Sequence, residues 1–132
     1  MRLGHVALSV SDAERSTAFY RKHFGFRRVR RYAYPDKGVA ITILDRDGIT
    51  LEFFEFKDHR PLPAYRRVLE RELPTLGVKH FSVEVPDIAG VYEKFRKAKV
   101  PLATDMRRFG SGARYFFIKD PDGILVEIME AL

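Results

Sequence analysis

The chain has 132 residues, of which 45% are hydrophobic and 32% charged. This suits one compact globular domain and is too short for two independent ones. It contains no cysteine, which excludes disulfides, thiolate nucleophiles and Cys-ligated metals, so any metal ion must be bound by His, Asp or Glu. The formal net charge is +6, but the arginines form short scattered clusters without a nucleic-acid motif. We therefore expect a solvated basic surface or an anion-binding rim, and no nucleic-acid partner.

The first half of the chain changes from a strand pattern to a helix pattern and back. Residues 3–10 alternate apolar and polar side chains, as in a strand with one buried face. Asp12 stands where a helix N-cap belongs, and an apolar stripe at helical spacing runs to Phe24, just before Gly25. Three strands are then expected, over residues 27–34, 38–45 and 49–56.

The second half repeats this plan after a proline-rich linker over residues 57–79, in which we expect a helix over 64–72. A strand begins at His80, Asp87 is the expected N-cap of the next helix, and its apolar stripe runs to Ala98. Three strands again follow, over residues 102–109, 113–119 and 124–130. No apolar run is long enough to cross a membrane and no signal-peptide pattern is present, so we expect a cytoplasmic protein without a membrane partner.

An internal repeat connects the two halves. A shift of 75 residues aligns HVALSVSD (residues 5–12) with HFSVEVPD (residues 80–87), and DRDGI (45–49) with DPDGI (120–124). Asp-Gly in the second pair of sequences predicts a hairpin turn in each half. The same shift aligns the two histidines and two glutamates, so that each histidine precedes its glutamate by 47 residues: His5 and Glu52, His80 and Glu127.

These four residues are expected to share one concave face. Side chains alternate between the two faces of a strand, so helices on the opposite faces leave the aligned His and Glu residues facing a common cavity. A carboxylate inside an apolar strand is costly unless it is paired or bound to a metal. We therefore predict a divalent metal site (Ni, Zn, Co, Mn or Fe) formed by His5, Glu52, His80 and Glu127, with the two glutamates as proton-transfer groups.

The other polar residues near these motifs receive simpler interpretations. Ser9 and Glu84 share the histidine face and stand either beside a substrate or at the rim. Glu55 lies on the opposite face of its strand and is expected to be exposed. His23 and His59 have no repeat partner and are expected on a helix surface and in the linker.

The motifs together resemble those of the vicinal oxygen chelate superfamily. They are the opening HVALSV followed by FYRKHFGF, then LEFFEF, HFSVEV and KDPDGILVEIME. This superfamily includes glyoxalase I, methylmalonyl-CoA epimerase, extradiol dioxygenases, and the fosfomycin and bleomycin resistance proteins. The resemblance covers nearly the whole chain and implies an α+β fold. Two tandem βαβββ modules, 1–56 and 80–132, joined by the linker 57–79, would build an open, curved mixed sheet around a metal cavity within one domain, 1–132.

The resemblance is greatest to glyoxalase I, and it carries the family's metal positions over to His5, Glu52, His80 and Glu127. It implies a lyase or isomerase that transfers a proton on a small bidentate oxygen substrate through a metal-stabilised enediolate, with Glu52 and Glu127 as the catalytic groups. A homodimer is also implied, with the modules pairing within one chain or between two. The alternatives are an Fe-dependent extradiol-type dioxygenase, an epimerase like that for methylmalonyl-CoA, and a ligand-binding protein of the bleomycin-resistance type.

The sequence departs from the glyoxalase I pattern at two positions. Ser9 and Phe56 stand where glyoxalase I usually has the Arg and Asn that help to hold glutathione. Several aromatic or flexible apolar residues indicate a more apolar cavity instead, although core packing explains them equally well: Phe54, Phe56, Phe109, Tyr115, Phe117 and Met129.

Overall fold

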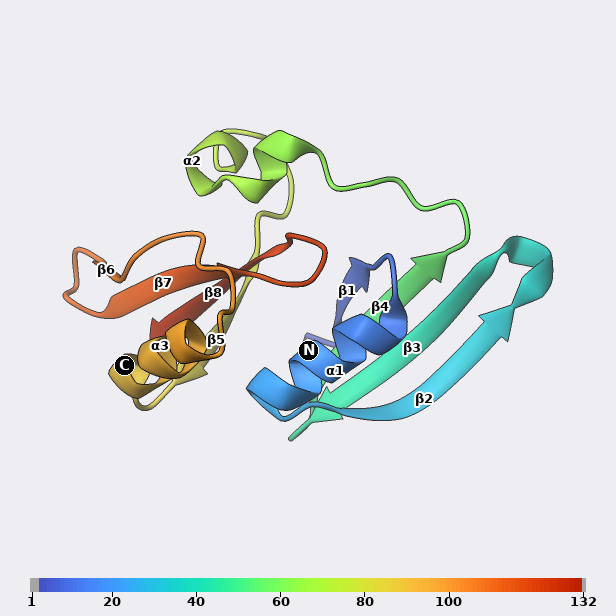
Figure 1. Ribbon diagram of the computed structural model, residues 1–132, viewed down its shortest axis with the longest axis horizontal. Helices are drawn as coiled ribbons and strands as arrows, with labels where there is room; N and C mark the ends of the chain where they lie inside the picture. The colour runs from blue at the N-terminus through green and yellow to red at the C-terminus, as the bar shows by residue number, and fades with distance from the viewer. Residues whose placement is uncertain (1–2, 132) are drawn as a thin grey trace. The chain divides into compact units, whose positions relative to one another are not determined.

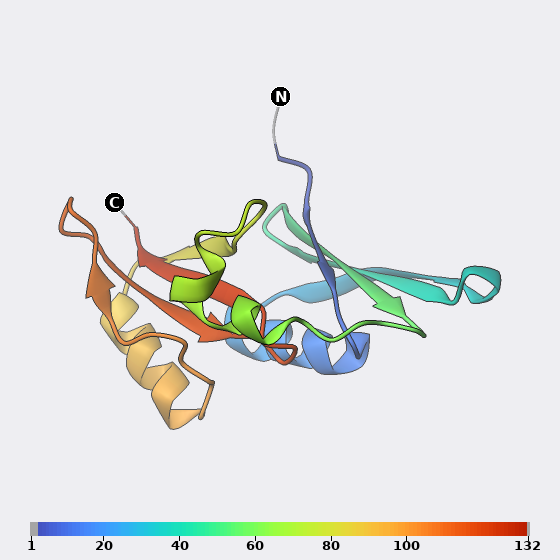
Figure 2. The same ribbon diagram turned by 90° about the horizontal axis from the view of Figure 1, so that it is seen from above.

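The computed structural model describes residues 3–131 and divides into two compact units, Met1–Pro61 and Leu62–Leu132. Each unit contains one four-stranded mixed sheet with an α-helix packed on it (Figures 1 and 2). No helix among the described residues is long and apolar enough to span a membrane. The predicted α+β architecture of two βαβββ modules is confirmed.

The first unit has the strand order β1-β4-β3-β2, in which β1 and β4 are parallel and the other pairs antiparallel. Its elements are β1 (Val6–Ser9), α1 (Ala13–Phe24), β2 (Arg27–Tyr34), the 3-10 turn Pro35–Lys37, β3 (Val39–Arg46) and β4 (Ile49–Phe56).

Helix α1 forms where the sequence predicts it and covers one face of this sheet. The Asp12 side chain accepts a hydrogen bond from the amide of Arg15, and Gly25 ends the helix in a left-handed conformation with φ 75°. The buried Tyr20 ring lies 5.4 Å from the Phe53 ring of β4. Because neighbouring residues of a strand point to opposite faces, Glu52 points away from the helix.

The second unit repeats the topology, with the order β5-β8-β7-β6 and a parallel β5–β8 pair. Its elements are the 3-10 turn Ala64–Arg67, α2 (Leu69–Glu72), β5 (Phe81–Val85), α3 (Ile88–Lys97), β6 (Arg107–Arg108), β7 (Arg114–Lys119) and β8 (Leu125–Glu130).

Helix α3 covers the sheet of the second unit in the same way as α1 covers that of the first. The Asp87 side chain caps it by accepting a hydrogen bond from the amide of Gly90 at 2.9 Å. Phe95 packs on Phe116 of β7, with ring centroids 6.2 Å apart. Phe116 pairs with Ile128, so this face is the one opposite Glu127.

Two predicted elements differ from the structure. The helix expected over 64–72 is split, because Val68 has an extended backbone (φ −122°, ψ 113°) between the 3-10 turn and α2. The strand expected over 102–109 is reduced to Arg107–Arg108 and an isolated bridge between Leu102 and Ile118. The hydroxyl of Thr104 accepts the Phe117 amide at 3.0 Å, and this side-chain acceptor takes the place of a backbone one.

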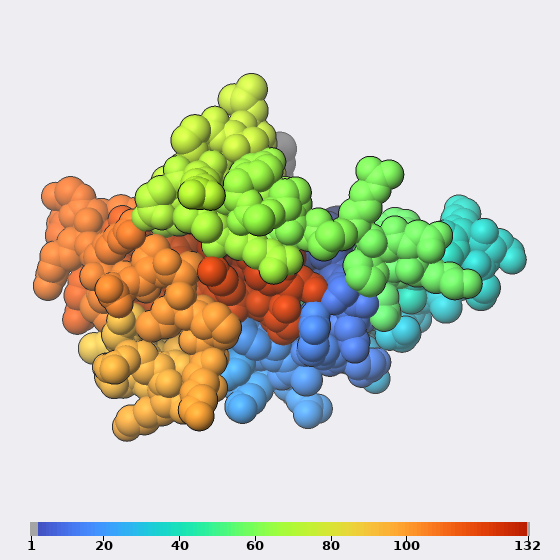
Figure 3. Space-filling view, turned by 45° about the horizontal axis from the view of Figure 1, so that its top comes forward, coloured from blue at the N-terminus to red at the C-terminus, as the bar shows by residue number. Residues whose placement is uncertain are grey.

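Residues 62–79, which we call the 62–79 segment, belong to the second unit and are not a free connection. Leu69 is buried in a cluster with Phe117 and Leu125 of that unit. In the space-filling view the yellow-green segment lies directly against the orange and red strands (Figure 3). The segment therefore contacts the second unit through Leu69, whereas most of its other side chains are exposed.

Candidate functional site

In the first unit, the parallel pairing of β1 with β4 brings the predicted histidine and glutamate together. Ala7 pairs with Glu52, and His5 precedes Ala7 by two residues, on the same side of the strand. The Nε2 atom of His5 lies 3.3 Å from Oε2 of Glu52. The His5 side chain is 53% exposed and the Glu52 side chain 20% exposed.

The second unit repeats this arrangement with the same atoms. Ser82 pairs with Glu127, and His80 stands two residues before Ser82. Nε2 of His80 lies 3.4 Å from Oε2 of Glu127, and the side chains are 24% and 10% exposed. The internal repeat is thus a repeat of one His–Glu pair, and the second pair is the more buried.

Both pairs have the spacing of two ligands of one metal ion. Two donors that each lie about 2.1 Å from an ion, at tetrahedral or octahedral angles, are roughly 3.0–3.4 Å from each other. Imidazole and carboxylate are also suitable donors for Zn²⁺, Ni²⁺, Co²⁺, Mn²⁺ and Fe²⁺. Within residues 3–131, however, there is no group of three or more His, Asp or Glu side chains placed to hold a metal. Each unit brings two of the four predicted ligands together.

The imidazole ring of His80 packs against an aromatic side chain. Its ring lies edge-on to the Phe117 ring, with centroids 4.8 Å apart and an interplanar angle of 86°. Its Nδ1 atom is buried without a hydrogen-bond partner in the described part of the chain. Because Phe117 pairs with Glu127 across β7 and β8, the same aromatic ring stands beside both members of the pair.

The sheet face around Glu52 is mostly apolar. Ile43 pairs with Glu52 across β3 and β4, and Ile41 pairs with Phe54. The rings of Phe54 and Phe56 are stacked with centroids 6.3 Å apart. A substrate group on this face would meet aliphatic and aromatic carbon.

The Glu127 face has the same character with a charged edge. Tyr115 pairs with Met129, two residues beyond Glu127, and Phe109 stacks on Tyr115 at 4.1 Å. Arg107 pairs with Tyr115 and makes an ion pair with Glu70 at 2.8 Å. The residues predicted to line an apolar cavity therefore lie on or beside the Glu faces of their own units. That they line one cavity stays a prediction.

The remaining sequence candidates are placed as follows. Ser9 pairs with Phe54 and Glu84 with Met129, so both lie on the histidine side of their strands, and both are exposed. His59 is exposed in the segment after β4, as predicted. His23, predicted on a helix surface, lies in the last turn of α1 and is half-buried.

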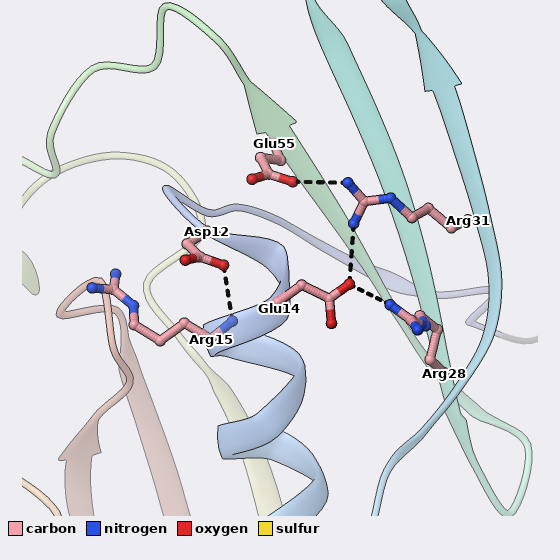
Figure 4. A network of polar contacts seen from close by, with 6 residues as sticks. All are labelled: Asp12, Glu14, Arg15, Arg28, Arg31 and Glu55. Carbon is pink, nitrogen blue, oxygen red and sulfur yellow. Dashed lines mark hydrogen bonds and ion pairs between the residues drawn. The ribbon is translucent and has the colours of Figure 1, made fainter.

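Glu55 corrects one expectation. It lies on the face opposite Glu52, as predicted, but its side chain is only 30% exposed. Arg31 donates to it at 3.5 Å, and the same guanidinium reaches Glu14, which also pairs with Arg28 (Figure 4). Strand β2, which lies beyond β3 in the sheet, thus supplies the arginine that pairs with this partly buried carboxylate.

Glu72 is a buried charged residue that the sequence analysis did not select. Its side chain is 1% exposed, and its Oε1 atom lies 3.0 Å from Arg66 and 3.3 Å from Lys79. Burial alone would raise the pKa of this carboxyl. The hydrogen bonds from Arg66 and Lys79 outweigh that effect and hold the pKa below its usual range. A Glu in a short charged stretch normally lies on a helix surface, so no sequence signal marks it as buried.

Comparison with known proteins gives a family match over almost the whole chain. The model of the Glyoxalase/Bleomycin resistance protein/Dioxygenase superfamily matches residues 2–128. A mitochondrial methylmalonyl-CoA epimerase of Mus musculus is 27% identical over 98% of this chain and 73% of its own length. A lactoylglutathione lyase of Pseudomonas putida is 27% identical over 96% of this chain and 83% of its own. The crystal structure of a glyoxalase family protein from Enterococcus faecalis is 25% identical, with a TM-score of 0.82 over 98% of this chain and 97% of that one.

Proposed function

Because the chain belongs to the glyoxalase/bleomycin resistance protein/dioxygenase superfamily, we propose that it is a metal-dependent lyase or isomerase of the glyoxalase I type. Its substrate would be a small molecule with two neighbouring oxygen atoms. The observation that carries this proposal is the repeated His–Glu pair, with 3.3 Å and 3.4 Å between the same two atoms. The proposed ligands of one divalent ion (Ni, Zn, Co, Mn or Fe) are His5, Glu52, His80 and Glu127.

The proposed chemistry is the transfer of a proton between neighbouring atoms of the substrate. The bound ion would act as a Lewis acid for the charge that develops on a substrate oxygen. The carboxylate of Glu52 or Glu127 would take the proton from carbon and return it, because each can both accept and donate at an oxygen. Apolar neighbours such as Ile43 and Phe117 limit the water around these carboxylates and so strengthen their electrostatic interactions with the ion and the substrate.

Two residues that help to hold glutathione in the glyoxalase I pattern are not present in this chain. Ser9 and Phe56 replace the glutathione-holding residues of the glyoxalase I pattern, and Phe56 stacks on Phe54. These observations favour a second candidate, an epimerase of acyl-CoA thioesters, whose reaction at the α-carbon needs the same proton transfer. The similarity to methylmalonyl-CoA epimerase supports it to the same degree as the similarity to lactoylglutathione lyase supports the first.

Solvent deuterium uptake tests both candidates together. The purified protein, loaded in turn with Ni²⁺, Co²⁺, Mn²⁺ and Zn²⁺, is incubated in D₂O with the hemithioacetal of methylglyoxal and glutathione, or with a branched acyl-CoA thioester. We expect deuterium at the reacting carbon of at least one substrate. Glu52→Gln and Glu127→Gln should each reduce this by about 10²–10⁴-fold, the usual contribution of a positioned acid–base group.

Glu55→Gln is the matched control, because it changes a carboxylate of the same strand that faces away from Glu52. It should retain the wild-type rate. Absence of both product formation and deuterium uptake with every metal would refute the proposal. Oxygen consumption with catechols under Fe²⁺ would then indicate the dioxygenase class, and binding of an aromatic drug by metal-free protein the bleomycin-resistance class.

A further inference from the structure

The 62–79 segment contains an ion cluster centred on the buried side chain of Glu72. One oxygen of this carboxylate accepts hydrogen bonds from Nε of Arg66 at 3.1 Å and from Nζ of Lys79 at 3.3 Å. Arg66 also donates to the carbonyl of Val78 at 3.3 Å. A buried carboxylate with two cations on one oxygen has little freedom to move, because any displacement leaves a charge without its partner.

Lys79 connects this cluster to the candidate site, since it directly precedes His80. Its ammonium group also donates to the backbone carbonyls of Glu72, at 3.3 Å, and of Thr75. The Lys79 side chain therefore donates to three oxygen atoms of Glu72 and Thr75, and Lys79 is the residue next to the proposed ligand His80. The direction in which the chain enters β5 is fixed by these contacts.

A second set of contacts connects the same segment to the imidazole ring of His80. Leu69 is 4% exposed and packs with Phe117 and Leu125. Phe117 is the residue whose ring supports the His80 ring edge-on at 4.8 Å. The segment thus fixes both the backbone before His80 and the wall against which its ring rests.

Among the described residues of the first unit, no comparable support for His5 is found. His5 follows Leu3, which is 81% exposed, and Gly4, which has no side chain. The His5 side chain is 53% exposed against 24% for His80. The two pairs join the same atoms at 3.3 Å and 3.4 Å, but within residues 3–131 only the second pair is connected to the 62–79 segment.

We propose that Glu72 and Lys79 are positioning residues for His80. Their ion pair holds the His80 imidazole toward Glu127 in the metal-free protein, so that this half of the site is arranged before an ion binds. The orientation is a property of the protein alone; its consequence for metal affinity rests on the proposed function.

The test compares Lys79→Met and Glu72→Gln with the control Glu70→Gln. Glu70 is an exposed carboxylate of the same short helix, and it pairs with Arg107. In metal-free protein, the nuclear Overhauser effect between the ring protons of His80 and Phe117 reports the orientation. We expect it to fall by more than half in the first two variants and to persist in the control, with the His5 signals unchanged in all three.

Titration with Ni²⁺ gives the functional readout. Supporting residues behind a metal ligand typically contribute about 10–100-fold in affinity, so we expect Lys79→Met and Glu72→Gln to bind Ni²⁺ about tenfold more weakly. Glu70→Gln should stay within about twofold, and Lys79→Arg should restore most of the loss because it retains a cation.

An unchanged ring contact in both variants, together with a lower melting temperature, would overturn the proposal, because Glu72 would then be merely structural. If Glu72→Gln does not fold, Lys79→Met decides alone, since it leaves the Glu72–Arg66 pair in place. If wild-type protein binds none of Ni²⁺, Zn²⁺, Co²⁺, Mn²⁺ and Fe²⁺, the proposed function fails, while the ring contact still decides the positioning role.

Discussion

Two buried threonines differ in whether their hydroxyl groups form hydrogen bonds. Thr104 is 6% exposed, and its hydroxyl accepts the amide of Phe117 at 3.0 Å. Thr42 is 1% exposed, and its hydroxyl has no hydrogen-bond partner in the part of the chain that the structure describes. The first hydroxyl satisfies a backbone group, whereas the second is a buried polar atom with a cost and no compensation.

Replacement of each threonine by valine, which has nearly the same shape, should therefore give opposite results. Thr104→Val leaves the Phe117 amide without this acceptor and should lower the free energy of unfolding by about 1–3 kcal/mol. Thr42→Val removes only an unpaired hydroxyl and should leave the free energy unchanged or raise it. Urea denaturation of the three proteins measures both. Equal losses would show that Thr42 has a partner of its own, such as a buried water.

At the scale of elements, the sequence predicts those limits of helices and strands that depend on residues close together in the chain. Strands β2 and β4 have the predicted limits, and α1 lies between its predicted caps, Asp12 and Gly25. The shortening of the strand predicted over 102–109 to Arg107–Arg108 could not be predicted, because it accompanies a hydrogen bond from the Phe117 amide to the Thr104 hydroxyl, 13 residues apart in the chain. The buried position of Glu72 likewise depends on cations at Arg66 and Lys79 that fold back onto it.

The two hairpin turns of the repeat differ in conformation because Pro121 stands where the first turn has Arg46. Asp47 and Gly48 both have positive φ, 53° and 83°, as a two-residue hairpin turn requires. In the second turn only Gly123 does, at 85°. Pro121 has a fixed negative φ and no amide proton, so it cannot occupy the strand position that Arg46 holds in the first turn. The second turn is consequently wider, and Asp120 accepts the amides of Asp122 and Ile124 within it.

The pairing of β7 with β8 contains an ion pair that makes stability depend on pH. Arg114 donates to Glu130 through both its backbone amide, at 3.2 Å, and its side chain, at 3.1 Å. The side-chain hydrogen bond is the larger cause that lowers the pKa of Glu130 from 4.5 to about 2. Because the folded-state pKa is the lower one, the stabilisation is fully present above pH 4.5 and is lost as the pH falls toward 2.

Arg114→Met should therefore lower the melting temperature most near pH 6–7. The difference from wild type should shrink between pH 4.5 and 2 and vanish below that range. Melting curves recorded by circular dichroism across this range provide the measurement. Glu130→Gln, which removes the titrating group, should show the same dependence. A difference that stays constant down to pH 2 would mean that the arginine acts by packing and not through the carboxylate.

At the scale of the whole molecule, the repeat explains why the two His–Glu pairs could be predicted without a structure. Each His–Glu spacing, the alternation in β4 and β8, and the helices on the opposite faces follow from the sequence pattern, and the structure confirms them unit by unit. A pattern within one module cannot show whether the two His–Glu pairs come together to form one site. That the units form one domain, and that the protein works as a homodimer, stay predictions for the same reason.

Metal stoichiometry separates one joint site from two independent ones. A His–Glu pair alone offers two protein donors, whereas sites of this kind use three or four. We therefore expect one ion per chain, and almost complete loss of it in either His5→Ala or His80→Ala, because each variant leaves the other pair without enough ligands. Two independent sites would instead give two ions per chain, with half retained in each variant. Elemental analysis after equilibrium dialysis against Co²⁺ measures this, and His59→Ala, a histidine outside both pairs, should keep its ion. Half-occupancy in both variants would mean that the two units bind metal separately, and the shared site would have to be abandoned.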